Sequence, residues 1–193
     1  MQNTIIHLIG KPGVGKYTIG SHVARLAGAR LVDNHSVANV IFNLIAPDGV
    51  TPLPAEIWPR VAQVRAAVLD TVAYVSPPGM SFVFTNFIRG EDPGEYAAFM
   101  ELVAVAEARA STFVPVILSC GTSELMRRVV SPDRRDRMKL IGPTEAARLN
   151  DEVPQFSTPH PHTLELDVSD RAPDDAARVI IAWAERCQVP PGP

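Results

Sequence analysis

A glycine-rich segment near the start of the chain constrains its fold more than any other feature. Residues 10–16 read Gly-Lys-Pro-Gly-Val-Gly-Lys, which satisfies the pattern G-x4-G-K. A short β-branched run precedes the segment, and the stretch 15–27, whose apolar residues recur at helical spacing, follows it. In such a unit the glycines let backbone N–H groups point inward, and the helix N-terminus adds partial positive charge. The segment therefore predicts a loop that binds nucleoside triphosphate, with Lys16 reaching the β- and γ-phosphates.

The position after this lysine departs from the usual pattern. It is usually Ser or Thr, whose hydroxyl ligates magnesium, but here Tyr17 stands there and Thr18 follows. A tyrosine hydroxyl lies too far from its backbone for that role, so we expect Mg²⁺ to be held by phosphates and waters. The predicted nucleotide-binding loop comprises Gly10, Lys11, Pro12, Gly13, Val14, Gly15, Lys16, Tyr17 and Thr18.

Beyond this loop, segments typical of strands and of helices alternate along the chain. Apolar runs predict strands at 4–9, 30–33, 81–85, 113–119 and 163–167. Helical spacing predicts helices at 15–27, 37–45, 61–75, 95–110, 122–130 and 173–187. The alternation implies βαβ units, and hence a three-layer α/β/α fold with a mostly parallel sheet. Ligands bind such a sheet at the carboxyl ends of its strands, which here are Gly10, Asp33, Thr85–Asn86, Ser119 and Asp167.

Length, composition and charge limit the class of protein. The 193 residues fit a single domain, 1–193, with a sizeable core. A net charge of −3 argues against wholesale nucleic-acid binding, and no apolar run is long enough for a membrane span. Cys120 and Cys187 stand alone without metal-ligand spacing. We therefore expect reduced thiols in a cytoplasmic protein, with no metal site built by the chain itself.

The phosphate loop also carries a resemblance to a known family. GKPGVGKYT at 10–18 resembles the GxPGxGKGT loop of adenylate kinases, which also lack the hydroxyl directly after the lysine. The order of elements is similar to that of the nucleoside-monophosphate-kinase and shikimate-kinase group of P-loop small-molecule kinases. This resemblance implies a P-loop NTPase fold, with a five-stranded parallel sheet of order 2-3-1-4-5. It further implies ATP as the phosphoryl donor, a helical substrate-binding insert at about 37–75 and an arginine-bearing lid at about 127–142.

Asp33 is the candidate residue for contact with a phosphoryl acceptor. It ends the second predicted strand, within LVDNH. In shikimate kinases and the similar chloramphenicol phosphotransferases, an aspartate at this place contacts the acceptor hydroxyl. A carboxylate across from the γ-phosphate orients that hydroxyl and accepts its proton. The structural alternative is that Asp33, Asn34 or Ser36 caps the following helix. His35 is interpreted as a surface or capping residue.

Basic residues gather in one segment of this acidic chain, which indicates binding of a compact anion such as phosphate. The segment 127–139 contains Arg127, Arg128, Arg134, Arg135, Arg137 and Lys139 against two acidic residues, Asp133 and Asp136. By the resemblance, Arg127 or Arg128 lies against adenine. Arg134, Arg135 or Arg137 would contact the transferring phosphoryl group, which the planar guanidinium fork suits. The alternative interpretation is a solvated charged turn.

Three further segments allow two interpretations each. The loop after the last strand, with Arg171, borders adenine in the similar kinases, and otherwise it is an ordinary helix start. Thr85–Asn86 ends the third strand where an acidic Walker-B residue usually stands, which disfavours a motor or a hydrolase. His160 and His162 resemble metal ligands, but without acidic or Cys partners at ligand spacing they are interpreted as part of a proline-rich loop.

Two functions from different classes fit these observations. The first is a kinase that moves the γ-phosphoryl group of ATP to an unidentified small-molecule acceptor, with Lys16, Asp33, Arg134 and Arg135 as catalytic residues. The alternative is a nucleotide-binding regulatory module, or a slow ATPase without such an acceptor. Tyr17 and the missing Walker-B acid favour the regulatory module, whereas the arginine-rich segment and Asp33 favour the kinase. No nucleic-acid or membrane partner is expected.

Overall fold

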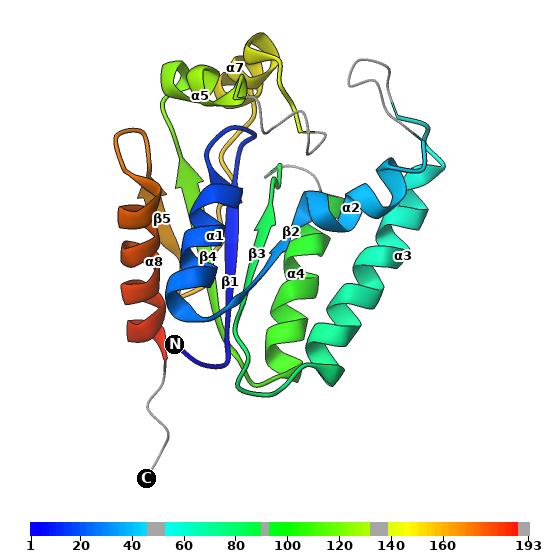
Figure 1. The fold of residues 1–193 in the computed structure, drawn as a ribbon, viewed down its shortest axis with the longest axis vertical. Helices are drawn as coiled ribbons and strands as arrows, with labels where there is room; N and C mark the ends of the chain where they lie inside the picture. Colours follow the sequence, from blue (N-terminus) through cyan, green and yellow to red (C-terminus); the bar gives the residue numbers. More distant parts are fainter. Residues whose placement is uncertain (46–52, 90–92, 132–138, 189–193) are drawn as a thin grey trace.

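The strands form one parallel sheet, ordered β2-β3-β1-β4-β5 (Figure 1). The computed structural model describes residues 1–45, 53–89, 93–131 and 139–188. Its strands are β1 (Thr4–Gly10), β2 (Arg30–Asp33), β3 (Phe82–Asn86), β4 (Thr112–Ser119) and β5 (Leu164–Asp167). Every neighbouring pair runs parallel. The predicted fold class, including the strand order 2-3-1-4-5, is confirmed.

Helices cover both faces of this sheet and connect its strands, as parallel pairing requires. They are α1 (Lys16–Ala27), α2 (Asn34–Phe42), α3 (Ile57–Asp70), α4 (Pro93–Ala108), α5 (Thr122–Val129), α7 (Pro143–Glu152) and α8 (Pro173–Cys187). A π-helical turn, η1 (Thr71–Val75), extends α3. Among the described residues, no helix combines the length and the apolar character that a membrane crossing needs.

The alternation of side chains along β1 divides the core into two layers. Ile6 and Leu8 face α1 and α8, and they pack in one cluster with residues of those helices such as Val23. Ile5 and Ile9 face the opposite side, where α3, η1 and α4 contribute residues such as Phe99. Figure 1 shows these helices on the two sides of the sheet. A strand buried on both faces reads as a nearly continuous apolar run, which is why β1 was visible in the sequence.

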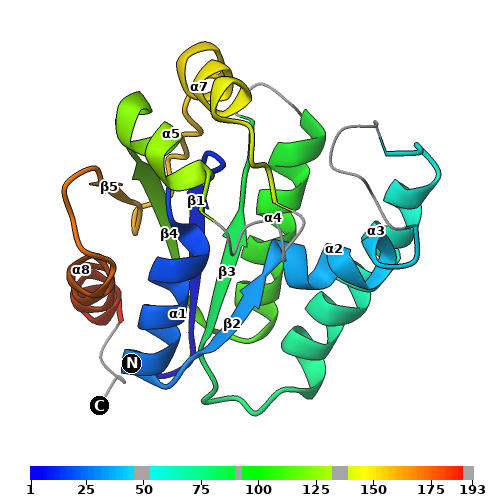
Figure 2. The same cartoon turned by 45° about the horizontal axis from the view of Figure 1, so that its top comes forward.

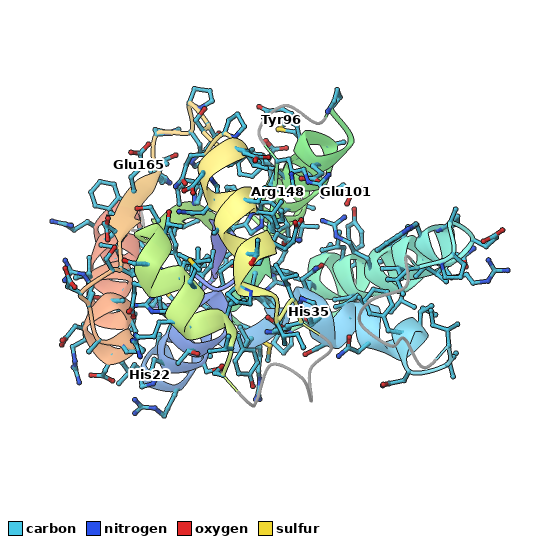
Figure 3. All side chains as sticks on the ribbon, turned by 90° about the horizontal axis from the view of Figure 1, so that it is seen from above. His22, His35, Tyr96, Glu101, Arg148 and Glu165 are labelled. Atoms are coloured by element: carbon cyan, nitrogen blue, oxygen red, sulfur yellow. The ribbon has the colours of Figure 1, made fainter. Side chains whose placement is uncertain are left out.

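The remaining helices lie around the carboxyl edge of the sheet. Figure 2 shows α5 and α7 over this edge, and Figure 3 shows α2 and α3 extending to one side. The helices α2 and α3 share a small cluster of their own, built from Ala38, Phe42 and Ile57. Trp58 meets the Phe42 ring edge-on, with 6.0 Å between ring centroids. This tryptophan therefore packs α3 against α2 through one ring edge, although its side chain is half exposed.

Several element boundaries differ from the sequence-based expectation by a few residues, and at two of them the structure shows a tertiary cause. The helix α2 begins at Asn34, directly after β2 and before the predicted start at 37. The Thr85 hydroxyl accepts the Asn34 N–H at 3.2 Å, so a neighbouring strand satisfies a backbone donor in the first turn. The predicted helix 61–75 widens into η1 at its end. There the Arg109 guanidinium donates to carbonyls of the turn, including that of Ser76 at 3.3 Å.

His7 is a buried polar residue in the central strand. Its Nε2 lies 3.0 Å from Asn86 Oδ1, and its ring stacks on Phe99 with 5.8 Å between centroids. The strand β4 passes on the other side, where Pro115 pairs with His7 and β5 has not yet begun. Pro115 therefore has a strand neighbour on one side only, which explains how a proline is tolerated here. Burial lowers the pKa of His7 to about 3, so the ring is neutral.

Because His7 is buried in its neutral form, the free energy of unfolding should depend on pH. An unfolded histidine takes up a proton below its ordinary pKa of 6.5, whereas His7 in the folded chain stays neutral down to about pH 3. The unfolded state therefore binds more protons in this window, and stability falls as the pH drops from 6.5 toward 3. His7→Gln should make that fall shallower by up to about 1.4 kcal/mol per pH unit. Urea unfolding of both proteins across this range measures the slopes, and equal slopes would contradict the prediction.

Candidate functional site

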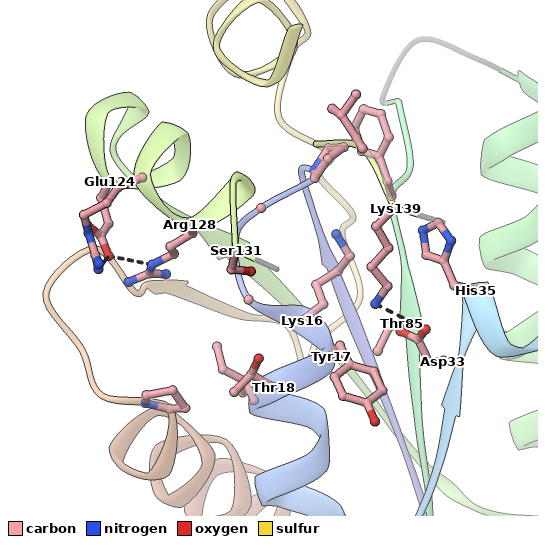
Figure 4. A pocket seen from close by; sticks show the side chains of 18 of the residues that line it. Lys16, Tyr17, Thr18, Asp33, His35, Thr85, Glu124, Arg128, Ser131 and Lys139 are labelled. Atoms are coloured by element: carbon pink, nitrogen blue, oxygen red, sulfur yellow. Dashed lines mark hydrogen bonds and ion pairs between the residues drawn. The ribbon is translucent and has the colours of Figure 1, made fainter. Parts of the chain in front are cut away.

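A cavity of about 870 Å³ opens at the carboxyl edge of the sheet (Figure 4). The phosphate loop forms its floor, the ends of β2 and β3 form one side, and α5 with the β5–α8 loop forms the other. Its lining includes Pro12, Gly13, Gly15, Lys16, Tyr17, Thr18, Asp33, Asn34, His35, Thr85, Asn86, Glu124, Arg127, Arg128, Ser131, Lys139 and Arg171. The position agrees with the expectation that ligands bind where parallel strands end.

The loop conformation explains why glycines stand where they do. Gly13 and Gly15 have φ angles of +95° and +106°, in the left-handed region that side chains disfavour. Gly10 passes so close to β4 that a Cβ atom would lie 2.7 Å from the Leu118 carbonyl oxygen. Gly15 is also the N-cap of α1, so the positive end of that helix faces the cavity. The curved backbone and the helix end form a cradle suited to phosphate oxygens.

The two lysines of the loop have different surroundings. Lys16 Nζ donates to the carbonyl oxygens of Gly10 at 2.5 Å and Lys11 at 3.0 Å, and its side chain lines the cavity. The Lys11 side chain is buried instead, and it donates to the Asn150 carbonyl at the end of α7. Burial lowers the pKa of Lys11. Lys16 is therefore the loop lysine placed to meet phosphates, whereas Lys11 joins the loop to α7.

Asp33 occupies a buried position in the cavity wall. It is 4% exposed, and its Oδ1 accepts a hydrogen bond of 2.8 Å from the Thr85 hydroxyl. Its Oδ2 lies 3.4 Å from Lys139 Nζ. Asp33 stands at the N-cap of α2, yet its carboxylate makes no capping hydrogen bond. The helix-cap alternative is therefore wrong for the Asp33 side chain: Thr85 on β3 and Lys139 hold this carboxylate, and not the helix that it precedes.

Lys139 completes a cluster around Asp33 and Tyr17. Its Nζ lies 4.6 Å from the centroid of the Tyr17 ring, which a cation approaches favourably over the ring face. Figure 4 shows Asp33, Lys139 and Tyr17 together on one side of Lys16. Tyr17, which departs from the usual motif, thus contacts the lysine that pairs with Asp33. In the sequence, Lys139 is one of the basic residues of the segment 127–139, and no local pattern distinguishes it from the others.

Arg128 joins the loops on the other side of the cavity. Its guanidinium donates to three carbonyl oxygens, those of Val14 at 3.1 Å, Val168 at 2.8 Å and Ser169 at 3.0 Å. Its Nε also donates to Glu124 at 2.6 Å. Arg128 therefore holds the phosphate loop against the β5–α8 loop. This contact is structural. The role against adenine, which the resemblance implies for Arg128, stays a prediction.

Arg127, the other arginine of α5, is 73% exposed and pairs with Glu124 at 2.6 Å. Hydrogen bonds from Arg127 and Arg128 lower the pKa of Glu124 to about 2. Arg171 lines the cavity from the exposed β5–α8 loop. The predicted phosphate-contacting residues Arg134, Arg135 and Arg137 lie outside the described residues, and their roles stay predictions.

His35 and the pair His160/His162 were interpreted as non-functional, and the structure separates them. His35, which the sequence suggested as a surface or capping residue, lines the cavity beside Asp33. His160 packs edge-on against Phe113 with 5.3 Å between centroids, and His162 Nδ1 lies 3.1 Å from the Phe113 carbonyl oxygen. Within the described ranges, no group of three or more His, Cys, Asp or Glu side chains forms a candidate metal site.

Comparison with known proteins relates this geometry to a group of enzymes. No family model matches the chain. A shikimate kinase from Mycobacterium ulcerans (strain Agy99) is 25% identical over 182 residues, which cover 91% of this chain and 86% of that protein.

Solved structures show the same fold at lower sequence identity. A sugar kinase from Janibacter sp. HTCC2649 has a TM-score of 0.63 at 15% identity, covering 95% of each chain. A gluconokinase from Sinorhizobium meliloti 1021 has a TM-score of 0.59 at 16% identity, covering 95% of this chain and 93% of its own. This chain has the P-loop fold of these kinases, and it is similar in sequence to a member of the small-molecule kinase group. The family resemblance predicted from the phosphate loop is thus confirmed.

The contacts of Arg128 predict that alanine substitutions of Arg128 and of its neighbour Arg127 lower the stability of the protein by different amounts. Arg128→Ala removes a charged donor from three carbonyl oxygens, so the free energy of unfolding should fall by about 2–3 kcal/mol. The matched control, Arg127→Ala, removes an exposed ion pair and should change stability by no more than about 0.5 kcal/mol. Denaturant unfolding measures both values, and equal losses would show that Arg128 does not hold the two loops together.

Proposed function

We propose that this chain transfers the γ-phosphoryl group of ATP to a hydroxyl of a small-molecule acceptor. The curated relative and the fold neighbours support an ATP-dependent small-molecule kinase. The observation that carries the proposal is the buried carboxylate of Asp33 in the wall of the cavity that Lys16 also lines. A passive nucleotide-binding module has no need of a buried carboxylate facing the phosphate loop, whereas a hydroxyl nucleophile does.

The donor half of the reaction rests on the phosphate loop. ATP supplies the transferable γ-phosphoryl group, and a Mg²⁺ ion shared by its phosphates neutralises their charge. Inward-facing amides of the loop and the N-terminus of α1 hold the phosphates, and Lys16 contacts the β- and γ-oxygens. Tyr17 offers no magnesium ligand in this geometry, so we propose that phosphates and waters hold the metal.

The acceptor half rests on Asp33. We propose that an acceptor hydroxyl lies between this carboxylate and the γ-phosphorus. Its O–H bond breaks and the proton passes to Asp33, while a new O–P bond forms and the bond to the leaving ADP oxygen breaks. Lys139 compensates the charge of the buried carboxylate at 3.4 Å, and Thr85 fixes its orientation. Catalysis then depends on positioning and electrostatics.

The residues that complete this site come from the basic segment and the region around α2 and α3. We propose that Arg134 and Arg135, in a lid at about 127–142, contact the phosphoryl group in transfer. The region of about 37–75 is proposed to shape the acceptor pocket, and Arg127, Arg128 and Arg171 to border the nucleotide base. The Thr85–Asn86 end of β3 and Tyr17 favour the alternative of a nucleotide-binding regulatory module, since β3 lacks a Walker-B acid there.

Substitution of Lys16 tests whether the loop binds phosphates or has only a structural role. Lys16→Ala removes the charge that faces the β- and γ-phosphates, so ATP affinity should fall by about tenfold or more, while the fold is retained. Lys11→Met is the matched control, because its side chain is buried against α7 and does not line the cavity. Calorimetric titration with ATP measures both variants. Unchanged binding by Lys16→Ala would show that the loop does not hold phosphates as proposed.

Asp33 tests the proposed function itself. Asp33→Asn keeps the shape and the hydrogen bond from Thr85 but loses the carboxylate. ATP binding should survive, whereas phosphoryl transfer should fall by about 10²–10⁴-fold, or less if the transition state is loose. Transfer from radiolabelled ATP across a panel of alcohols, sugars and acids gives the rates.

The control for this variant is Asp70→Asn, which removes an exposed carboxylate at the end of α3. Its transfer rate should equal that of the parent chain. An Asp33→Asn protein that is stable and fully active would remove Asp33 from the mechanism and would leave the regulatory-module alternative standing.

A further inference from the structure

This chain differs from the usual P-loop pattern at both positions from which the protein holds magnesium. In that pattern, a hydroxyl directly after the loop lysine and an acid at the end of a neighbouring strand hold the ion. Here Tyr17 takes the first position, and β3 ends in Thr85–Asn86. The Tyr17 hydroxyl stands at the far end of its ring, and the Thr85 hydroxyl donates to Asp33 Oδ1 at 2.8 Å. These two positions therefore do not fit a magnesium ion held by the protein.

A cation of the chain itself lies beside both positions. Lys139 Nζ is 4.6 Å from the centroid of the Tyr17 ring and 3.4 Å from Asp33 Oδ2. Figure 4 shows the amino end of Lys139 directed to Asp33. The side chains of Lys139 and Asp33 are only 10% and 6% exposed, so the ammonium lies inside the cavity wall. The ring at position 17 thus contacts a cation, at the place where the hydroxyl of the usual motif contacts one.

The chemistry of this ammonium suits a contact with bound phosphates. A cation over the face of an aromatic ring is attracted to it, and the attraction is stronger where water is excluded. An ammonium has three N–H donors, so it can meet a carboxylate and a phosphate oxygen at the same time. Lys16 and Lys139 line the same cavity, above the loop that cradles the phosphates. A nucleoside triphosphate on the loop therefore lies beside both lysines.

We infer that Lys139, seated on the Tyr17 ring, is a phosphate-binding residue that takes the place of a magnesium ion held by the protein. Its ammonium contacts a β- or γ-phosphate oxygen from the Asp33 side of the cavity. The inference rests on the nucleotide-binding half of the proposed function and names a further cation of that site. Tyr17 is a positioning residue, since it acts through Lys139. Position 17 then makes no contact with a magnesium ion that ATP carries.

The test removes the ammonium without leaving a buried charge unpaired. Lys139→Met alone would deprive the Asp33 carboxylate of its partner, so a neutral background is used. Asp33→Asn retains the hydrogen bond from Thr85, and we expect it to bind ATP as the parent chain does. Asp33→Asn combined with Lys139→Met then differs from this background only in the ammonium. Calorimetric titrations with ATP, in excess Mg²⁺ and in EDTA, give the affinities of both proteins.

The double variant should bind metal-free ATP about tenfold or more weakly than Asp33→Asn, the loss expected for one charged hydrogen bond. In excess Mg²⁺ the loss should be smaller, because the metal already neutralises part of the phosphate charge. Equal ATP affinities of the two proteins would overturn the inference. Equal losses with and without Mg²⁺ would show a general packing role for Lys139 and would overturn it as well.

Two substitutions of Tyr17 test its positioning role without touching the buried ion pair. Tyr17→Phe keeps the ring face, so it should bind ATP as the parent does in both buffers. Tyr17→Thr removes the ring and supplies the hydroxyl of the usual motif. It should bind metal-free ATP about 3- to 10-fold more weakly, with most of the affinity restored by Mg²⁺. Parent-like binding of metal-free ATP by Tyr17→Thr would contradict the positioning role. A loss of affinity in Tyr17→Phe only when Mg²⁺ is present would make the tyrosine hydroxyl a metal ligand and overturn the inference.

The same titrations separate failure of the inference from failure of the proposed function. A parent chain that binds ATP in neither buffer would overturn the assignment of the phosphate loop, and the proposed function with it. A parent chain that binds ATP, while the Lys139 and Tyr17 variants bind it equally well in both buffers, would overturn the inference alone. The kinase function would then stand with Lys139 as a partner of Asp33 only.

Discussion

The close approach of the phosphate loop to the sheet is the constraint on which the site depends. Gly10 lies against β4 with no room for a Cβ beside the Leu118 carbonyl oxygen, and Gly15 begins α1 in a left-handed conformation. These two positions let the chain turn sharply from β1 into α1 while its amides point into the cavity. Every other group of the site is arranged around this turn, because the turn decides where the phosphates lie.

Balanced charges hold the two walls of the cavity in place. On the α5 side, Arg128 links the carbonyl groups of two loops and is itself paired with Glu124. On the other side, Lys139 offsets the buried charge of Asp33 and rests on the Tyr17 ring. Each pair keeps a charged group in the cavity wall at low cost, since a buried charge without a partner would be strongly unfavourable. The two walls of the cavity thus differ in their charged groups.

The sequence predicted the elements of the fold well, because strands buried on both faces and amphipathic helices have distinct periodicities. It failed where a tertiary contact sets a boundary. The helix α2 starts early because the Thr85 hydroxyl on β3 accepts the Asn34 N–H, and the widened turn η1 is joined by Arg109, the residue directly after α4. Such contacts link residues far apart in the chain, so no local sequence pattern predicts them.

The sequence by itself determined the phosphate loop, the layered α/β architecture and the group of proteins to which the chain is similar. The motif, its flanking strand and helix, and the alternation of elements are local properties that neighbouring residues encode. Only the tertiary structure determined which partners the polar residues contact. It paired Asp33 with Lys139, turned Lys11 away from the cavity and placed His7 beneath Asn86. The physical reason is that charge pairing and hydrogen bonding depend on distances between strand ends and loops, which arise only when the sheet assembles.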